Sequence, residues 1–94
     1  MDAIIELAIE SPGGIIDCRV EPVCDDEGQQ YYTATILYPN IVNGFSRSEI
    51  YCHNLSRDTK TGQYFFEDAE DIHPKIKKLE AEISKAISRA VAGS

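Results

Sequence analysis

The period of the hydrophobic pattern changes once along the chain, and this change limits the fold more than any other sequence feature. In the first two thirds, apolar residues alternate with polar ones, which is the pattern of strands with one buried face. Near the C-terminus they recur at steps of three and four residues, which is the pattern of a helix with one apolar stripe. The sequence therefore predicts several strands followed by one helix.

The alternating part of the chain divides into four strands and a shorter fifth segment. The expected strands are Ile5–Glu10, Ile16–Glu21, Gln30–Tyr38 and Glu49–Leu55, with a short strand or an edge anchor at Gln63–Phe66. Turns rich in glycine, proline and short polar residues separate them, at Ser11–Gly14, Asp25–Gly28 and Asn43–Gly44. Pro39 and Asn40 are expected to break the third strand, because proline cannot donate a ladder hydrogen bond. Strands joined in order by short turns form an antiparallel meander.

One amphipathic helix is predicted from about Ile72 to Val91. Its apolar stripe consists of Ile72, Ile76, Leu79, Ile83, Ala86, Ile87 and Ala90. Asp71 is the expected N-cap, because Pro74 then falls in the first turn, where its missing N–H has no helical partner. The predicted fold class is α+β, an antiparallel meander sheet of four or five strands with this helix packed on one face.

The length and composition predict a single domain over residues 1–94. Ninety-four residues can build one hydrophobic core, and 43% apolar residues is an ordinary globular composition.

No apolar run approaches the roughly 18 residues of a membrane span, and the N-terminus lacks the basic region of a signal peptide. We therefore expect a cytoplasmic protein, whose three cysteines are reduced, buried and structural.

The negative charge is concentrated in the first half of the chain. Residues 1–46 contain eight acidic residues and one basic residue, Arg19, whereas residues 47–94 contain eight of each sign, so the whole net charge of −7 lies in the first half. Such a field repels phosphates, which argues against direct binding to nucleic acid. It favours a basic protein as partner.

Cys52, His53 and His73 are the residues best suited to nucleophilic chemistry, because a cysteine attacks only when a base or a lowered pKa supplies the thiolate. Neighbouring residues of a strand point to opposite faces, however, so His53 is not expected to reach the Cys52 sulfur. Zinc sites usually need close-spaced ligand pairs, which Cys18, Cys24 and Cys52 do not provide. We expect no catalytic residue, no metal and no cofactor.

Two acidic clusters have local structural explanations. Asp25–Gly28 resembles a hairpin turn whose short acids stabilise the bend, and Glu67–Asp71 precedes a helix N-terminus, where negative charge is favourable. Neither has the spacing of a calcium-binding loop. A glycine-rich phosphate loop is also missing from the sequence, since Gly13–Gly14 is an isolated turn.

One helix covers only one face of a sheet, so the second face is expected to remain open. The third strand carries bulky residues toward both faces, and we expect Tyr31, Leu37 and Tyr51 to lie on the open one. A two-fold homodimer is the commonest way to cover such a patch.

Two functional hypotheses follow from different classes. In the first, the chain is a non-catalytic protein-binding module that self-associates through the open sheet face or an edge strand and presents its acidic first half to a basic partner. One such case is an inhibitor that presents a phosphate-like surface to a nucleic-acid-binding protein. The residues expected to bind the partner are Asp25, Asp26, Glu27, Tyr31 and Leu37. In the alternative, the chain is a small enzyme or metal-binding protein that uses Cys52, His53, His73 and nearby acids.

Overall fold

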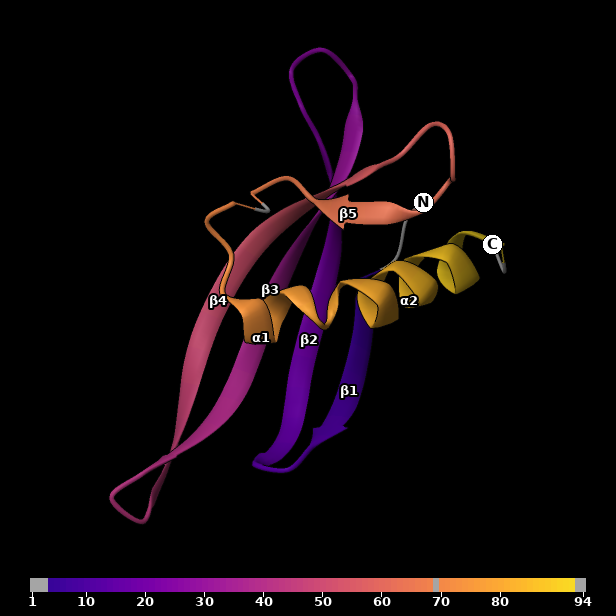
Figure 1. Cartoon of the computed structure of the whole chain (residues 1–94). Helices are drawn as coiled ribbons and strands as arrows, with labels where there is room; N and C mark the ends of the chain where they lie inside the picture. The colour runs from indigo at the N-terminus through magenta and orange to yellow at the C-terminus, as the bar shows by residue number, and fades with distance from the viewer. Residues whose placement is uncertain (1–3, 69, 93–94) are drawn as a thin grey trace.

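The computed structural model describes residues 4–68 and 70–92, which form five strands and two helical segments. The strands are β1 (Ile5–Ser11), β2 (Gly14–Cys24), β3 (Gln30–Val42), β4 (Phe45–Arg57) and β5 (Tyr64–Phe66), and the helices are α1 (Pro74–Lys77) and α2 (Glu80–Ala92). The strands form one antiparallel sheet in the order β1-β2-β3-β4-β5, and both helices lie on one face of it (Figure 1). The α+β meander predicted from the sequence is confirmed.

The third and fourth strands are longer than predicted, and the prediction that Pro39 and Asn40 end the third strand is wrong. Pro39 pairs with Ser48, and the ladder continues to Val42 opposite Phe45. Backbone polar groups of successive strand residues point to alternate sides, and the nitrogen of Pro39 points away from β4. The ladder between β2 and β3 ends at Leu37, so the missing N–H of Pro39 removes no ladder hydrogen bond.

The predicted single helix is divided into two segments by a tight turn. The N–H of Leu79 bonds to the carbonyl of Ile76, three residues back, between α1 and α2. The prediction that Asp71 is the N-cap is wrong, because the cap is His73, whose Nδ1 accepts from the N–H of Lys75 at 3.2 Å. A residue before proline disfavours helical geometry, so the helix begins only at Pro74.

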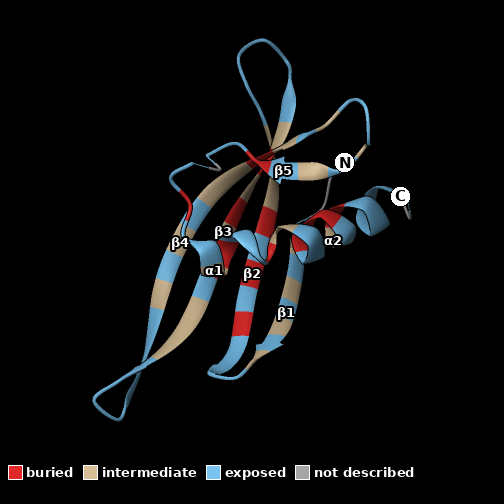
Figure 2. Cartoon of the chain, in the orientation of Figure 1, coloured by how far each residue is buried: buried red, intermediate tan, exposed pale blue. Residues whose placement is uncertain are grey.

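The helical stripe packs against the sheet as predicted, except at Ala90, which is exposed. Ile76, Ile83 and Ile87 are fully buried, and they belong to one core whose sheet residues come mainly from β2 and β3. The buried residues of the sheet are Ile16, Cys18, Val20, Tyr32, Ala34, Ile36, Leu55 and Phe66. Figure 2 shows this core concentrated where the helices cross the strands.

The hairpin of β3 and β4 extends beyond the helices. Its distal part, residues 39–48, which we call the hairpin arm, projects from the body of the molecule (Figure 1). Ile41 and Phe45 in this arm are 62% and 74% exposed, although both are large apolar residues. Asn43 and Gly44 form its two-residue turn, in which both have positive φ (51° and 79°), as expected for an Asn-Gly hairpin.

Neither helix in the described part of the chain has the length and apolar character needed to cross a bilayer.

Candidate functional site

The sheet face opposite the helices is the main candidate site, and we call it the open face. It consists of Glu6, Ala8, Glu10, Ile15, Asp17, Arg19, Glu21, Tyr31, Thr33, Thr35, Leu37, Ser48, Ile50, Cys52, Asn54 and Phe65. Burial alternates along β2 and β3, and the side chains of the open face are exposed or half-buried. The sequence prediction that one sheet face remains uncovered by the helix is consistent with this pattern.

The half of the open face on β1 and β2 is acidic. Arg19 is the one basic residue of these two strands, and its Nε lies 3.0 Å from Oε1 of Glu21. Among the described residues, no cation pairs with Glu6, Glu10 or Asp17. This half therefore carries uncompensated negative charge.

The half of the open face on β3 and β4 is uncharged and carries an exposed aliphatic pair. Leu37 and Ile50 lie opposite each other in the ladder and are 38% and 67% exposed. Four positions along the same ladder, the Oγ1 of Thr33 donates a hydrogen bond to Oδ1 of Asn54 at 3.0 Å. The two strands thus offer an exposed aliphatic surface formed by Leu37 and Ile50.

A hollow of about 620 Å³ lies where the acidic and apolar halves meet. Its lining consists of Glu6, Leu7, Ala8, Asp17, Cys18, Arg19, Thr35, Leu37 and Ile50. Asp17 stands opposite Leu37, so a carboxylate borders an aliphatic surface. Lysine and arginine have an aliphatic stem and a cationic end, and they match this combination.

The structure distributes the predicted partner-binding residues over separate places. Asp25, Asp26 and Glu27 lie on the β2–β3 turn, where Oδ1 of Asp25 accepts the backbone N–H of Glu27 at 2.9 Å. Tyr31 lines a smaller hollow of about 270 Å³ together with Asp25. Leu37, by contrast, lines the larger hollow on the open face.

Several residues of the larger hollow carry no local sequence signal of a site. Glu6, Asp17 and Ile50 lie there with Leu37. Alternation along one strand predicts which side chains share a face. It does not predict which residues of neighbouring strands lie opposite each other, because that depends on the ladder register. In this register Asp17 pairs with Leu37, which in turn pairs with Ile50.

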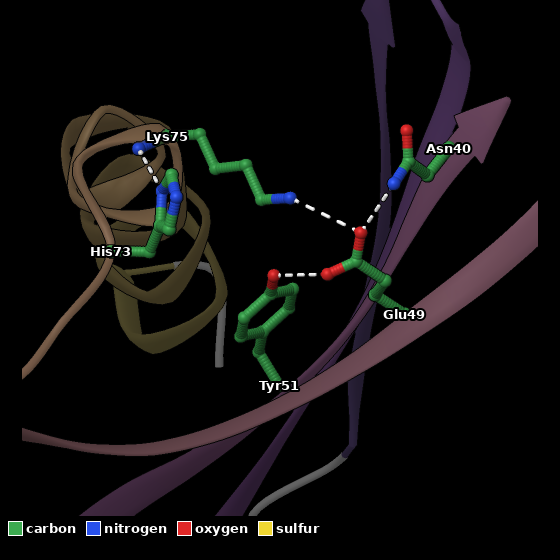
Figure 3. Close-up of polar contacts among 5 residues, drawn as sticks. All are labelled: Asn40, Glu49, Tyr51, His73 and Lys75. Carbon is green, nitrogen blue, oxygen red and sulfur yellow. Dashed lines mark hydrogen bonds and ion pairs between the residues drawn. The ribbon is translucent and has the colours of Figure 1, made fainter. Parts of the chain in front are cut away.

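A second polar cluster lies under α1, on the face that carries the helices (Figure 3). Glu49 accepts hydrogen bonds from Nδ2 of Asn40 at 2.6 Å and from the hydroxyl of Tyr51 at 2.5 Å. Lys75 lies 3.5 Å from the same carboxylate, and its Nζ is 4.5 Å from the ring centre of Tyr38. The cluster joins the base of the hairpin arm to α1.

Tyr51 belongs to this cluster, so the prediction that it shares the open face with Tyr31 and Leu37 is wrong. Tyr51 pairs with Ile36, which is fully buried beneath the helices. Paired residues of adjacent strands point to the same face, so Tyr51 also points toward the helices.

The cluster makes the folded state sensitive to acid. The hydrogen bond from Tyr51, followed by that from Asn40 and by the charge of Lys75, lowers the pKa of Glu49 from its ordinary value of 4.5. The ionised carboxylate therefore stabilises the folded state above pH 4.5, and this contribution is lost as the pH falls through the lowered pKa.

Tyr51→Phe should raise the pKa of Glu49 toward 4.5, because it removes the largest cause of the lowered value. An NMR titration of the Glu49 carboxyl carbon measures this change, and Tyr31→Phe on the other face is the matched control. The free energy of unfolding of Tyr51→Phe should then fall less steeply than that of wild type as the pH drops below 4.5. An unchanged pKa of Glu49 in Tyr51→Phe would contradict this account.

The structure does not bring the residues of the alternative hypothesis together. Cys52 lies exposed on the open face opposite Thr35, whereas His53 points to the other face and is close to Phe66. His73 is used as the cap of α1. Within residues 4–68 and 70–92, no group of three or more histidine, cysteine or acidic side chains could hold a metal ion.

The expectation that all three cysteines are buried is correct only for Cys18. Burial, with a smaller effect of Asp17, raises the pKa of the Cys18 thiol to about 11. Cys24 and Cys52 are exposed, because Cys24 lies at the end of β2 and Cys52 on the open face. All three thiols are free.

Comparison with known proteins adds no functional assignment to this geometry. No protein family, curated protein or solved structure matches the chain.

Proposed function

We propose that the chain is a cytoplasmic protein-binding domain that holds a basic polypeptide segment on its open face. The observation that carries this proposal is that the uncompensated acids of β1 and β2 and the exposed aliphatic surface of β3 and β4 line the same hollow. The free thiols of Cys18, Cys24 and Cys52 fit a reducing compartment.

The 620 Å³ hollow suggests how such a segment is held. A lysine or arginine stem lies along Leu37 and Ile50, and its cationic end reaches the carboxylate of Asp17 or Glu6. Burial of the aliphatic surface supplies affinity, while the carboxylates select for a basic segment. The net charge of −7 also accelerates the encounter with a cationic partner, and salt weakens this effect.

Nucleic-acid-binding proteins are the partner class that this surface suits best. Their binding surfaces combine basic residues with apolar or aromatic ones. A domain that presents carboxylates beside an aliphatic patch competes with nucleic acid for such a surface. In this proposal the chain acts as an inhibitor, and it requires no catalytic residue.

The proposal is tested with a fluorescent amphipathic peptide of lysine and leucine, compared with the same peptide in which glutamate replaces lysine. Fluorescence anisotropy should show binding of the lysine peptide, weaker at high salt, and little binding of the glutamate peptide. Asp17→Asn should weaken binding about two- to fivefold, as expected for a partly exposed ion pair. Ile50→Asn should weaken it about tenfold through the loss of buried aliphatic surface.

Glu82→Gln is the matched control, because it removes one negative charge from the exposed side of α2, which lies on the other face of the sheet and away from the hollow. This variant should bind the peptide like wild type. Equal binding of both peptides, or an equal loss in Asp17→Asn and Glu82→Gln, would overturn the proposal.

A further inference from the structure

Most of the outer edge of β4 has no partner strand in the described part of the chain. β4 has 13 residues, but β5 pairs only with Leu55, Ser56 and Arg57. The N–H of Glu67 extends this contact by one hydrogen bond, to the carbonyl of Asn54 at 2.9 Å. The edge from Phe45 to His53 therefore remains open to another strand.

The direction of the Asn54 carbonyl shows which backbone groups this edge presents. The N–H and C=O of one residue in an antiparallel strand point to the same side, and the side alternates along the strand. Ser46, Ser48, Ile50 and Cys52 consequently direct both groups outward, as Asn54 does. The segment contains no proline or lysine, which commonly protect such edges from pairing.

We propose that two copies of the chain pair along this edge, with β4 antiparallel to β4 about a two-fold axis at Ser48. Each copy contributes five strands, so the dimer has one continuous sheet with the helices of both copies on the same face. The occupant of the edge is a second copy because the edge is complementary to itself in charge and in shape.

The charges select this register. With the axis at Ser48, Arg47 of one copy lies opposite Glu49 of the other, and the symmetry gives this pair twice. An axis at residue 47 or at residue 49 places identical charges directly opposite each other, which is destabilising. An axis at Ile50 brings Ser46 against Asn54, whose carbonyl is already bonded to Glu67.

The apolar side chains support the same register. Phe45, which is 74% exposed, lies opposite Tyr51 of the second copy on the helix-bearing face. Ile50, which is 67% exposed, lies opposite Ser46 of the second copy on the open face. Cross-strand pairs of aromatic residues stabilise antiparallel ladders. Pairing therefore covers the two most exposed large apolar residues of β4.

The dimer does not depend on the proposed function, although it would place the two open faces side by side. Sedimentation velocity over a concentration series tests it directly. Wild type should shift from monomer to dimer as concentration rises. Hydrogen exchange at the amides of Ser46, Ser48 and Ile50 should slow over the same range, because these outward groups gain partners only in the dimer.

Ser48→Pro removes an N–H that faces outward, so it costs the monomer no ladder hydrogen bond. The dimer loses two hydrogen bonds, and its dissociation constant should rise at least about tenfold. Circular dichroism confirms that this variant is folded. Arg47→Glu is a second variant that leaves the backbone intact and places like charges opposite each other, with an expected increase of about tenfold.

Arg57→Glu is the matched control, because it makes the same charge change on β4 where β5 already covers the edge. Its dissociation constant should stay within about threefold of wild type, because this substitution changes only the long-range repulsion between the two copies. A wild-type chain that remains monomeric at the highest concentration would overturn the proposal. A dimer that resists both Ser48→Pro and Arg47→Glu, or that responds equally to Arg57→Glu, would also overturn it.

Discussion

Replacing Phe66 by alanine should lower the free energy of unfolding by about 3–5 kcal/mol, the range for large aromatic residues in cores. Phe66 is 1% exposed and lies in β5, opposite Leu55 and with its ring centre 5.7 Å from that of His53. β5 has only three residues, so the strand has few other contacts to hold it against the sheet. The truncation therefore leaves a cavity between β5, β4 and the helices.

Phe65→Ala is the matched control for this prediction. Phe65 is the same residue type in the same strand, but it points to the open face and is 41% exposed. Its truncation should cost less than about 1.5 kcal/mol, since little cavity forms at a half-exposed site. Urea unfolding followed by circular dichroism gives both values. Equal losses at the two positions would show that β5 does not pack as described.

Ile83→Ala should destabilise the fold by about 2–5 kcal/mol. Ile83 is fully buried at the centre of the helical stripe, and α2 contacts β1, β2 and β5 around it. For a chain of this size the whole stability is about 5–14 kcal/mol, so one truncation here removes a large part of it. The same urea titration measures the loss.

Lys85→Ala tests whether this effect comes from packing rather than from the helix itself. Lys85 is exposed on α2, two residues from Ile83, and alanine is an equally good helix former. The variant should remain within about 0.5 kcal/mol of wild type. If Ile83→Ala also lowered the free energy of unfolding by less than about 0.5 kcal/mol, α2 would not dock on the sheet as described.

The fold was predictable from sequence because its signals are local. Alternation along Ile5–Ile9 and Ile16–Val20 predicts strands, and the recurrence of Ile76, Leu79 and Ile83 predicts a helix, without knowledge of distant residues. The prediction at Pro39 was wrong because a proline ends a strand only where the ladder requires a backbone N–H at its position. That condition is set by where the β2–β3 ladder ends.

The candidate sites were less predictable because they depend on register. The open face follows from alternation in each strand, but the alignment of Asp17, Leu37 and Ile50 requires the pairing of three strands. Glu49 and Lys75 are 26 residues apart, and nothing in their local sequence indicates that they meet. Tyr51 was assigned to the wrong face for the same reason.

The order of the strands has a consequence for synthesis on the ribosome. Each strand pairs with its neighbour in sequence, so hairpins can form as the chain emerges. The layer that covers their apolar side, α2, is translated after all five strands. Val20, Ala34 and Ile36 therefore face water in the nascent sheet until α2 has emerged from the ribosome. During this interval, the nascent chain exposes the surface most prone to aggregation.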